Sequence, residues 1–414
     1  MKQASAVLGI IGILVVLFSF FCSKDLFYTY YRNKYKDLFY TYYRNKYNDR
    51  RLIKAIEKGT RLKADISVIP RTLIVEHLKS IFQPDSNQSF YHVICGEYGS
   101  GKTTLVKLAV SCGVIYVDIP SYIEDFGLAF GKALNFSFEE WISFPQLSRK
   151  LGDIYEDFNK TLWWRALKAF KRGARAYKAK YNKPAVIIYD NVDRLVHKNL
   201  EILDILQDDA KDNADDRIYI AVFISSEDTI LRRMKSRSSW SRAEMPMEIG
   251  GLNKEESMKY LAEKHKITEE AEKLYELVGG HILGLTAVAH DFLLGKSIED
   301  IGAKILLDAY DKFNSAKLLE DQKHHEAGKR VIDALLSSKE ISIEKFKELF
   351  ANEEEYGEVL EANVFAFHPS RNTVSFQSQS IEYYIRKRSD VFVELVNLTP
   401  DNEFNSNYAS TSKS

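Results

Sequence analysis

The sequence contains little cysteine and no excess of charge of either sign. Only three cysteines occur in 414 residues, and Cys22, Cys95 and Cys112 match neither a disulfide framework nor a metal-binding motif. This scarcity indicates an intracellular protein in a reducing compartment. The 58 basic and 58 acidic side chains cancel, which argues against a general binder of polyanions.

One long run near the N-terminus has no charge. As a helix, residues 6–22 would span about 26 Å, slightly less than a hydrocarbon core of about 30 Å. A cleaved signal peptide is the competing interpretation, but its apolar region is usually about 7–15 residues long. Lys2 is the only basic side chain before the run, whereas many follow it between residues 24 and 54. The positive-inside rule therefore predicts a single-pass membrane protein with the bulk of the chain on the cytosolic side.

A tandem repeat follows this run. Residues 24–35 recur without change as residues 36–47, and two copies are too few for a solenoid, which needs about three. The repeat is interpreted as a tolerant juxtamembrane linker. A collar of Tyr, Arg and Lys side chains on anionic lipid is the alternative.

A phosphate-binding loop comes directly after a short apolar segment. Residues 90–97 have the composition of a buried strand, and residues 96–104 match the pattern G-x-x-x-x-G-K-[ST] before an apolar helix. Glycines allow successive N–H groups to turn around phosphates, an ammonium group pairs with the β and γ phosphates, and a hydroxyl can ligate Mg²⁺. The expected nucleotide-binding residues are Gly96, Glu97, Tyr98, Gly99, Ser100, Gly101, Lys102, Thr103 and Thr104.

A second apolar strand ends in a carboxylate. Residues 185–190 finish at Asp190, which we expect to hold Mg²⁺ together with Thr103. In hydrolytic P-loop proteins the next residue is often acidic, but here it is Asn191, which can orient water and cannot accept its proton. Asp193 is the candidate to replace that acid, and a structural turn at Asp193 remains an equal alternative.

Polar residues also follow a third strand. Residues 217–226 end in Ser225 and Ser226, either of which could contact a γ-phosphate or simply cap the next helix. In the turn that follows, Arg237 or Arg242 could serve as an arginine finger in its own site or in a neighbour's. A solvated loop arginine is the alternative for each.

Strands that alternate with helices indicate a parallel sheet covered on both faces. Residues 113–120 and 245–249 supply two further strands of this α/β core. Residues 162–183 carry many basic side chains, which could form a nucleic-acid surface. Because apolar residues interleave with them at helical spacing, an amphipathic helix packed on the sheet is favoured.

The chain resembles the archaeal-type ATPases of the signal-transduction branch of P-loop NTPases, relatives of the origin-recognition ATPases. The likeness covers roughly residues 66–390 and rests on residues 69–71 with Glu76, the phosphate loop, AVIIYDNVD, FISSE, and IGGLNKEESMKYL followed by LVGG. It implies that Arg71 lines the adenine pocket and that residues 252–261 form the first lid helix, capped by Asn253 and Glu256. It also implies that the Gly279-Gly280-His281 turn approaches the nucleotide, although the family's proline after this turn is absent.

The C-terminal residues have the pattern of a winged-helix-like module. Three helices are expected at residues 327–337, 342–350 and 353–361, followed by a hairpin over 364–376 and a helix over 377–388. Such modules often bind DNA, but the helix at 353–361 carries five glutamates and no basic residue, so it would repel phosphate. We expect this module to support the lid or to dock an unknown protein partner, and do not expect it to bind nucleic acid.

These patterns divide the chain into a transmembrane signal anchor (1–23), a tandem-repeat linker (24–65), a three-layer P-loop ATPase core (66–251), a helical lid (252–323), a winged-helix-like domain (324–390) and a disordered tail (391–414). The expected function is a membrane-anchored, ATP-binding molecular switch. It would use ATP and Mg²⁺ and hydrolyse ATP to ADP and phosphate. A non-catalytic nucleotide-binding scaffold is the main alternative, and a DNA-associated ATPase is a weaker one.

Overall fold

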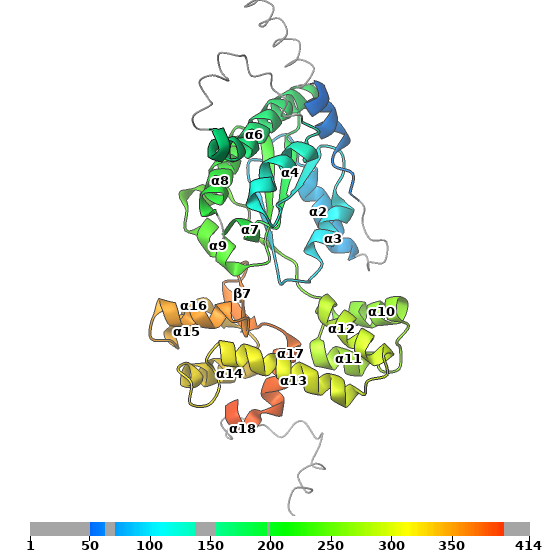
Figure 1. The fold of residues 1–414 in the computed structure, drawn as a ribbon, viewed down its shortest axis with the longest axis vertical. Helices are drawn as coiled ribbons and strands as arrows, with labels where there is room; N and C mark the ends of the chain where they lie inside the picture. The colour runs from blue at the N-terminus through cyan, green and yellow to red at the C-terminus, as the bar shows by residue number, and fades with distance from the viewer. Residues whose placement is uncertain (1–49, 63–70, 137–153, 197–198, 393–414) are drawn as a thin grey trace, which may run out of the picture.

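The computed structural model describes residues 50–62, 71–136, 154–196 and 199–392 (Figure 1). The expected membrane anchor at residues 6–22 and the repeat at residues 24–47 lie outside these ranges. Within them, no helix has the length and apolar content that crossing a membrane requires.

A five-stranded parallel sheet forms the centre of the first unit. Its strands pair in the order β2-β3-β4-β1-β5. They span His92–Cys95 (β1), Val114–Asp118 (β2), Ala185–Asp190 (β3), Tyr219–Ile224 (β4) and Met247–Glu248 (β5). The α/β parallel sheet expected from the sequence is confirmed.

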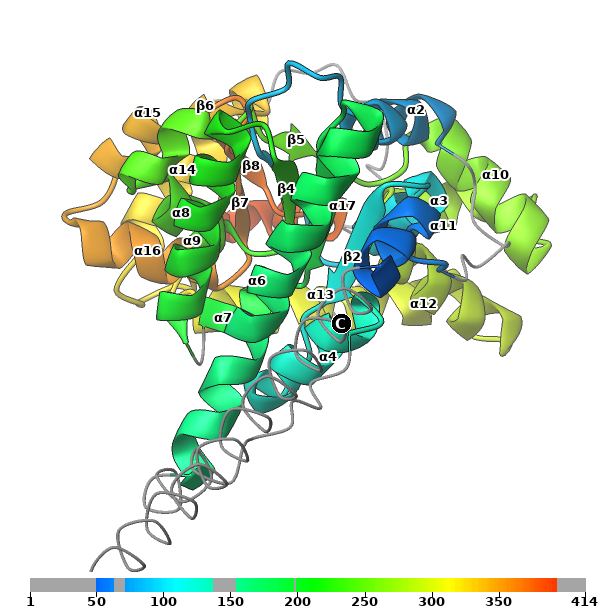
Figure 2. The same cartoon turned by 90° about the horizontal axis from the view of Figure 1, so that it is seen from above.

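Helices cover both faces of this sheet, as Figure 2 shows from above. One face is covered by α2 (Thr72–Phe82) and α3 (Lys102–Ala109). The other carries α4 (Phe126–Ala133), α6 (Ile154–Tyr181), α8 (Leu200–Asp215) and α9 (Asp228–Lys235). The short elements η1 (Ile123–Asp125), α7 (Asp193–Val196) and η2 (Ser238–Arg242) pack against the same core. The side chains of each strand divide between two cores, one on each face, because successive strand residues point to opposite sides.

Helix α6 is amphipathic. Its apolar residues Leu167, Phe170 and Ala174 are buried in the core, whereas Lys168 and Arg175 are exposed. The interpretation of this basic stretch as a helix packed on the sheet is therefore confirmed.

The core begins earlier in the chain than expected. Residues 50–58 are helical, and Leu52 and Ile56 are buried in the core. The N–H of Thr60 then donates to the carbonyl oxygen of Val114 at 2.9 Å, and its hydroxyl accepts from the N–H of Tyr116 at 2.9 Å. Residues 50–62 are thus part of the folded core, and the linker boundary drawn at residue 65 is wrong.

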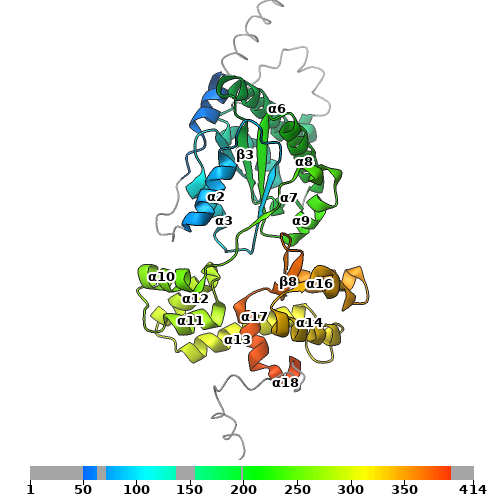
Figure 3. The same ribbon diagram turned by 180° about the vertical axis from the view of Figure 1, so that it is seen from behind.

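The lid is a helical unit with its own apolar core. It contains α10 (Lys254–His265), α11 (Ala271–Val278), α12 (Ile282–Leu293) and α13 (Ile298–Ser315). The far end of α13 packs into the C-terminal unit through Phe313. Helix α13 therefore links the two units, and Figures 1 and 3 show both on the same side of the core.

The C-terminal unit combines helices with a small antiparallel sheet. Its elements are α14 (His325–Ser338), β6 (Ile341–Ser342), α15 (Ile343–Glu348), α16 (Glu353–Glu361), β7 (Phe365–His368), β8 (Thr373–Phe376), α17 (Gln379–Lys387) and α18 (Ser389–Phe392). The expected helices and hairpin are present. Strand β6, which pairs with β8, was not expected. Because Phe392 is buried against Phe313 and Tyr384, this unit also extends past the expected boundary at residue 390.

Candidate functional site

The phosphate loop connects β1 to α3 and depends on glycine at three positions. Gly96, Gly99 and Gly101 have φ values of 145°, 81° and 89°, a region that side chains with a Cβ rarely adopt. A Cβ on Gly96 would lie 2.1 Å from the carbonyl oxygen of Ile249. Residues 96–101 therefore take this path only because these positions lack side chains.

Lys102 begins α3 and points its ammonium group into this loop. Its side chain is buried, with the residue 5% exposed, and Nζ donates to the carbonyl oxygens of Gly96 at 2.8 Å and Glu97 at 2.7 Å. Burial lowers the pKa of Lys102, and the carboxylates of Asp193 and Asp190 oppose that effect. The positive charge is thus held inside a cradle of backbone groups.

Asp190 ends β3 and is 1% exposed. Its Oδ2 accepts from the Tyr116 hydroxyl at 2.5 Å, its Oδ1 accepts from the N–H of Asn191 at 2.9 Å, and Thr103 also donates to this carboxylate. Burial raises the pKa of Asp190, while the Tyr116 and Thr103 hydroxyls lower it. The two side chains expected to hold Mg²⁺, Thr103 and Asp190, are therefore in contact.

These residues fit a triphosphate and a hard cation. Among the described residues, the buried Ser100 Oγ has no hydrogen-bond partner, and the N-terminus of α3 adds its positive dipole end beside Lys102. Thr103 and Asp190 offer the oxygen ligands that Mg²⁺ prefers and would hold it. When bound, Mg²⁺ would neutralise part of the phosphate charge.

Asp193 begins α7 and is engaged by the tip of β4. It accepts hydrogen bonds from the Ser225 hydroxyl, from the N–H of Ser226 at 3.0 Å and from the N–H of Glu227 at 3.3 Å. Burial raises the pKa of Asp193, and the Ser225 hydroxyl lowers it. Because donors surround this carboxylate, the geometry favours the structural role for Asp193 over the role of a base.

The profile of a family described as an ATPase domain predominantly from Archaea matches residues 71–288, more than half of the chain. The chain belongs to this family. Its site is the P-loop of an archaeal-type ATPase, as the resemblance of its motifs implied. Among curated proteins, none matches this ATPase.

Several solved structures share this arrangement loosely. The Walker-type ATPase of Pyrococcus abyssi has 13% identity and a TM-score of 0.46, over 76% of this chain and 95% of its own. The ORC2 protein of Aeropyrum pernix has 13% identity and a TM-score of 0.40, over 82% and 98%. The ORC1 protein of Aeropyrum pernix in complex with DNA has 12% identity and a TM-score of 0.38, over 81% and 94%. These likenesses are too loose to assign any property to this ATPase.

Arg242 lies at the amino end of the strands, the wrong end of the sheet for an arginine finger in its own site. Its carbonyl oxygen accepts from the N–H of Tyr91, just before β1, whereas the phosphate loop follows the other end of that strand, about 16 Å away. Its guanidinium pairs with Asp215. The expectation that Arg242 reaches the γ-phosphate of this ATPase in its own chain is therefore wrong.

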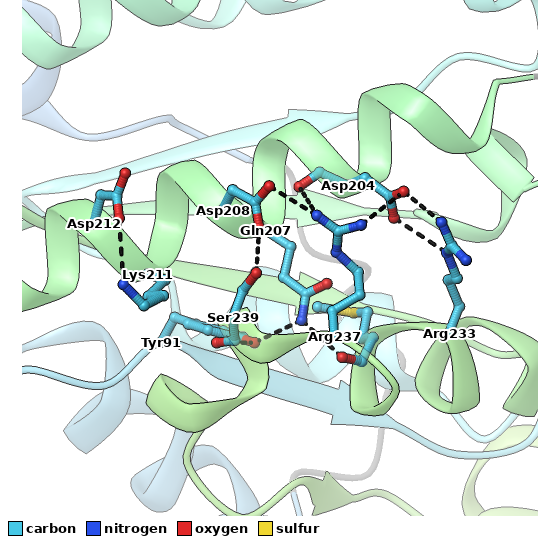
Figure 4. Close-up of polar contacts among 10 residues, drawn as sticks. Tyr91, Asp204, Gln207, Asp208, Lys211, Asp212, Arg233, Arg237 and Ser239 are labelled. Atoms are coloured by element: carbon cyan, nitrogen blue, oxygen red, sulfur yellow. Dashed lines mark hydrogen bonds and ion pairs between the residues drawn. The ribbon is translucent and has the colours of Figure 1, made fainter.

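Arg237, the second candidate in that turn, is also engaged elsewhere. Its Nη1 lies 2.9 Å from Asp204 Oδ2 and its Nη2 lies 2.7 Å from Asp208 Oδ2, both on α8 (Figure 4). Ser239 donates to Asp208 in the same network. These contacts fasten the segment after α9 to α8, and they give Arg237 a structural role.

Arg71 joins the core of this ATPase to its lid. Nη1 donates to the carbonyl oxygen of Gly250 at 2.7 Å, and Nε lies 3.4 Å from Glu256 Oε2. Glu256 and Asn253 form the expected capping box at the start of α10. Arg71 therefore contacts the chain where it enters the lid, and its adenine contact stays a prediction.

His281 brings the lid onto the phosphate loop. Its Nδ1 accepts from the N–H of Gly284 at 3.1 Å, so the proton is on Nε2, which donates to the carbonyl oxygen of Tyr98 at 2.8 Å. A Cβ on Gly99 would lie 2.6 Å from Leu283 Cδ1. The lid thus rests on the loop through residues 281–283.

The C-terminal unit reaches the core beside the same loop. Glu248, at the end of β5, accepts from the Ser370 hydroxyl at 3.0 Å and pairs with His368. Burial raises the pKa of Glu97 to about 7, and the charges of His368 and Lys312 oppose this shift. The core, the lid and the C-terminal unit therefore meet around Glu97.

Sequence reasoning missed two residues of the site. Tyr116 and Asp118 belong to β2, which we interpreted only as a strand. Tyr116 holds Asp190, and Asp118 is its neighbour in the pairing of β2 with β3. The signal that could have found them is the polar residue at the carboxyl end of a strand adjacent to β3.

Proposed function

We propose that this chain is an ATP-hydrolysing molecular switch, held on a membrane by residues 6–22 with its bulk on the cytosolic side. The observation that carries the ATP assignment is the buried ammonium of Lys102 inside a glycine-dependent loop, beside the paired Thr103 and Asp190. The membrane assignment rests on the uncharged N-terminal run and the basic residues after it.

Contacts of the lid with the loop support a switching role. His281 and Leu283 rest on residues 98 and 99, so a triphosphate in the loop would lie against the lid. A γ-phosphate can hold two such units together until hydrolysis removes its contacts.

A non-catalytic scaffold is the second candidate, and Asn191 favours it because an amide cannot act as a base. DNA remodelling is supported less well. Helix α16, the segment that a winged-helix-like module would present to DNA, exposes Glu353, Glu354 and Glu361. This acidic surface suits a basic protein partner better than a duplex.

Lys102→Ala tests the nucleotide assignment. We expect ATP affinity to fall by at least about 100-fold, since the variant lacks the ammonium group that pairs with the phosphates. The wild-type chain should melt at a higher temperature with ATP than without it, and the variant should not. An equal ATP-induced shift in both proteins would overturn the assignment.

Alkaline extraction combined with protease protection tests the membrane assignment. The chain should stay in the membrane pellet at high pH, and its core should be digested only from the cytosolic side. Release at high pH would overturn the anchor without affecting the ATP site. Turnover by the purified wild-type chain separates the switch from the scaffold, which binds ATP without hydrolysing it.

A further inference from the structure

Asn191 occupies the position after Asp190 where an acid would serve as a base, and its side chain points to a carboxylate. Its backbone has a φ of 60°, a left-handed conformation that asparagine tolerates better than most residues. Its Nδ2 donates to Asp118 Oδ1 at 2.7 Å. Because the amide nitrogen is used in this way, the amide oxygen is the atom that remains to accept a hydrogen bond from water.

Asp118 lies at the same end of the strands as Asp190 and the phosphate loop. It ends β2 and pairs in parallel register with Asp190, and neighbouring strands lie about 4.8 Å apart. Its side chain is 53% exposed, whereas Asp190 is 1% exposed. Arg194 Nη1 lies 3.2 Å from the same Oδ1, so both contacts described for this side chain involve one of its two oxygens.

The two carboxylates at and just after the end of β3, Asp190 and Asp193, are already engaged. Asp190 is held by Tyr116, Thr103 and the N–H of Asn191. Asp193 accepts from the tip of β4. Within the described ranges, Asp118 is therefore the more accessible of the two acids that end β2 and β3, with a side chain 53% exposed.

We propose that Asp118 is the catalytic base of ATP hydrolysis and that Asn191 orients the attacking water. In hydrolytic P-loop proteins one acid after the metal-side carboxylate often orients the water and accepts its proton. Here these two roles are divided between Asn191 and Asp118. As the water oxygen bonds to the γ-phosphorus, Asp118 Oδ2 accepts a proton from the water, and the bond from phosphorus to the bridging oxygen breaks and leaves ADP. The exposed carboxylate then releases the proton to solvent. This assignment rests on the proposed hydrolytic function.

The test measures ATP turnover and ATP affinity of the full chain with Asp118→Asn. We expect kcat to fall by about 100-fold or more, the usual effect of removing a general base, with Kd for ATP within about twofold of wild type. The acid limb of the kcat profile against pH should disappear, which a merely structural role for Asp118 would not produce. Glu124→Gln, an exposed acid in the connection after β2, is the matched control and should change neither quantity.

A second variant exchanges the acid and the amide. Asp118→Asn combined with Asn191→Asp keeps a hydrogen bond between the two side chains and puts the carboxylate directly after Asp190. Turnover should recover to within about tenfold of wild type.

The outcomes separate the claim that the chain hydrolyses ATP from the claim that Asp118 is the base. A wild-type chain that binds ATP without turning it over would overturn hydrolysis, and the base with it. Wild-type turnover that persists in Asp118→Asn, or that fails to recover in the exchanged variant, would overturn the assignment of Asp118 while hydrolysis stands.

Discussion

Nε2 of His281 donates to the carbonyl oxygen of Tyr98 at 2.8 Å, which joins the residue that caps the lid's third helix, α12, to the phosphate loop. The same ring also caps α12, since Nδ1 accepts from the N–H of Gly284. One side chain therefore has a local role within the lid and a long-range role between lid and core.

Two substitutions at His281 separate these roles. His281→Asn keeps a good helix cap but is too short to reach Tyr98, so we expect faster ATP release with thermal stability close to wild type. His281→Ala loses both contacts and should also lose about 1 kcal/mol of stability. Stopped-flow release of a fluorescent ATP analogue and thermal melting measure the two effects. Identical release rates in all three proteins would contradict the link between lid and loop.

Gly96→Ala should damage the fold of the loop. Its Cβ would lie 2.1 Å from the carbonyl oxygen of Ile249, and its φ of 145° suits only glycine. We expect a loss of about 2 kcal/mol or more and loss of ATP binding. Gly250→Ala is the matched control, because nothing lies within 4 Å of its Cβ and its stability should stay within about 1 kcal/mol. Denaturant titration compares them, and equal stabilities would refute this account of the loop.

Tyr116→Phe should make the Mg²⁺ requirement of ATP binding more sensitive to pH. The hydroxyl lowers the pKa of Asp190, so removing it raises that pKa further above its usual range and favours the protonated acid as pH falls. A metal ligand must be deprotonated, so more Mg²⁺ should be needed at pH 6 than at pH 8, and the difference should exceed that of wild type. Mg²⁺ titrations of ATP binding at both pH values measure this. A pH dependence equal to that of wild type would show that Tyr116 does not tune Asp190.

Glu97 should make the fold less stable as pH rises. Its pKa is about 7 in the folded chain against a usual 4.5. As pH rises, this carboxyl therefore loses its proton in the unfolded chain before it does so in the folded chain. The stability that the neutral acid provides is present in full below pH 4.5, is lost between pH 4.5 and 7, and amounts to at most about 3 kcal/mol.

Glu97→Gln should remove this loss, so the variant should melt at a higher temperature than wild type at pH 8 and at a similar one at pH 4.5. Glu76→Gln, an exposed acid on α2, serves as the control and should follow wild type. Parallel melting curves for wild type and Glu97→Gln across this range would rule out the burial of a neutral acid.

Local motifs were predictable from the sequence. The phosphate loop could be identified because its glycines, lysine and threonine are contiguous and each has a conformational or chemical reason to be there. The buried side of α6 and the capping box at Asn253 were predictable for the same reason, since helical spacing and capping involve residues only three or four positions apart.

Contacts between distant segments were not predictable in this way. Tyr116 and Asp118 meet residues 190 and 191 because β2 and β3 pair, and His281 meets Tyr98 across 183 positions. Arg242 was a plausible candidate because it lies in a turn near the site in sequence. The parallel pairing of β1 with β5 instead puts that turn at the amino end of these strands, whereas the phosphate loop lies at their carboxyl end.

The sequence by itself determined that the chain has a phosphate loop, a metal-side carboxylate and an α/β sheet, because those follow from short-range patterns. Only the tertiary structure decided which side chains surround that loop, which acid is left for chemistry, and where the core begins. Those depend on how strands and units pack, and side-chain periodicity shows which face is buried without showing what it is buried against.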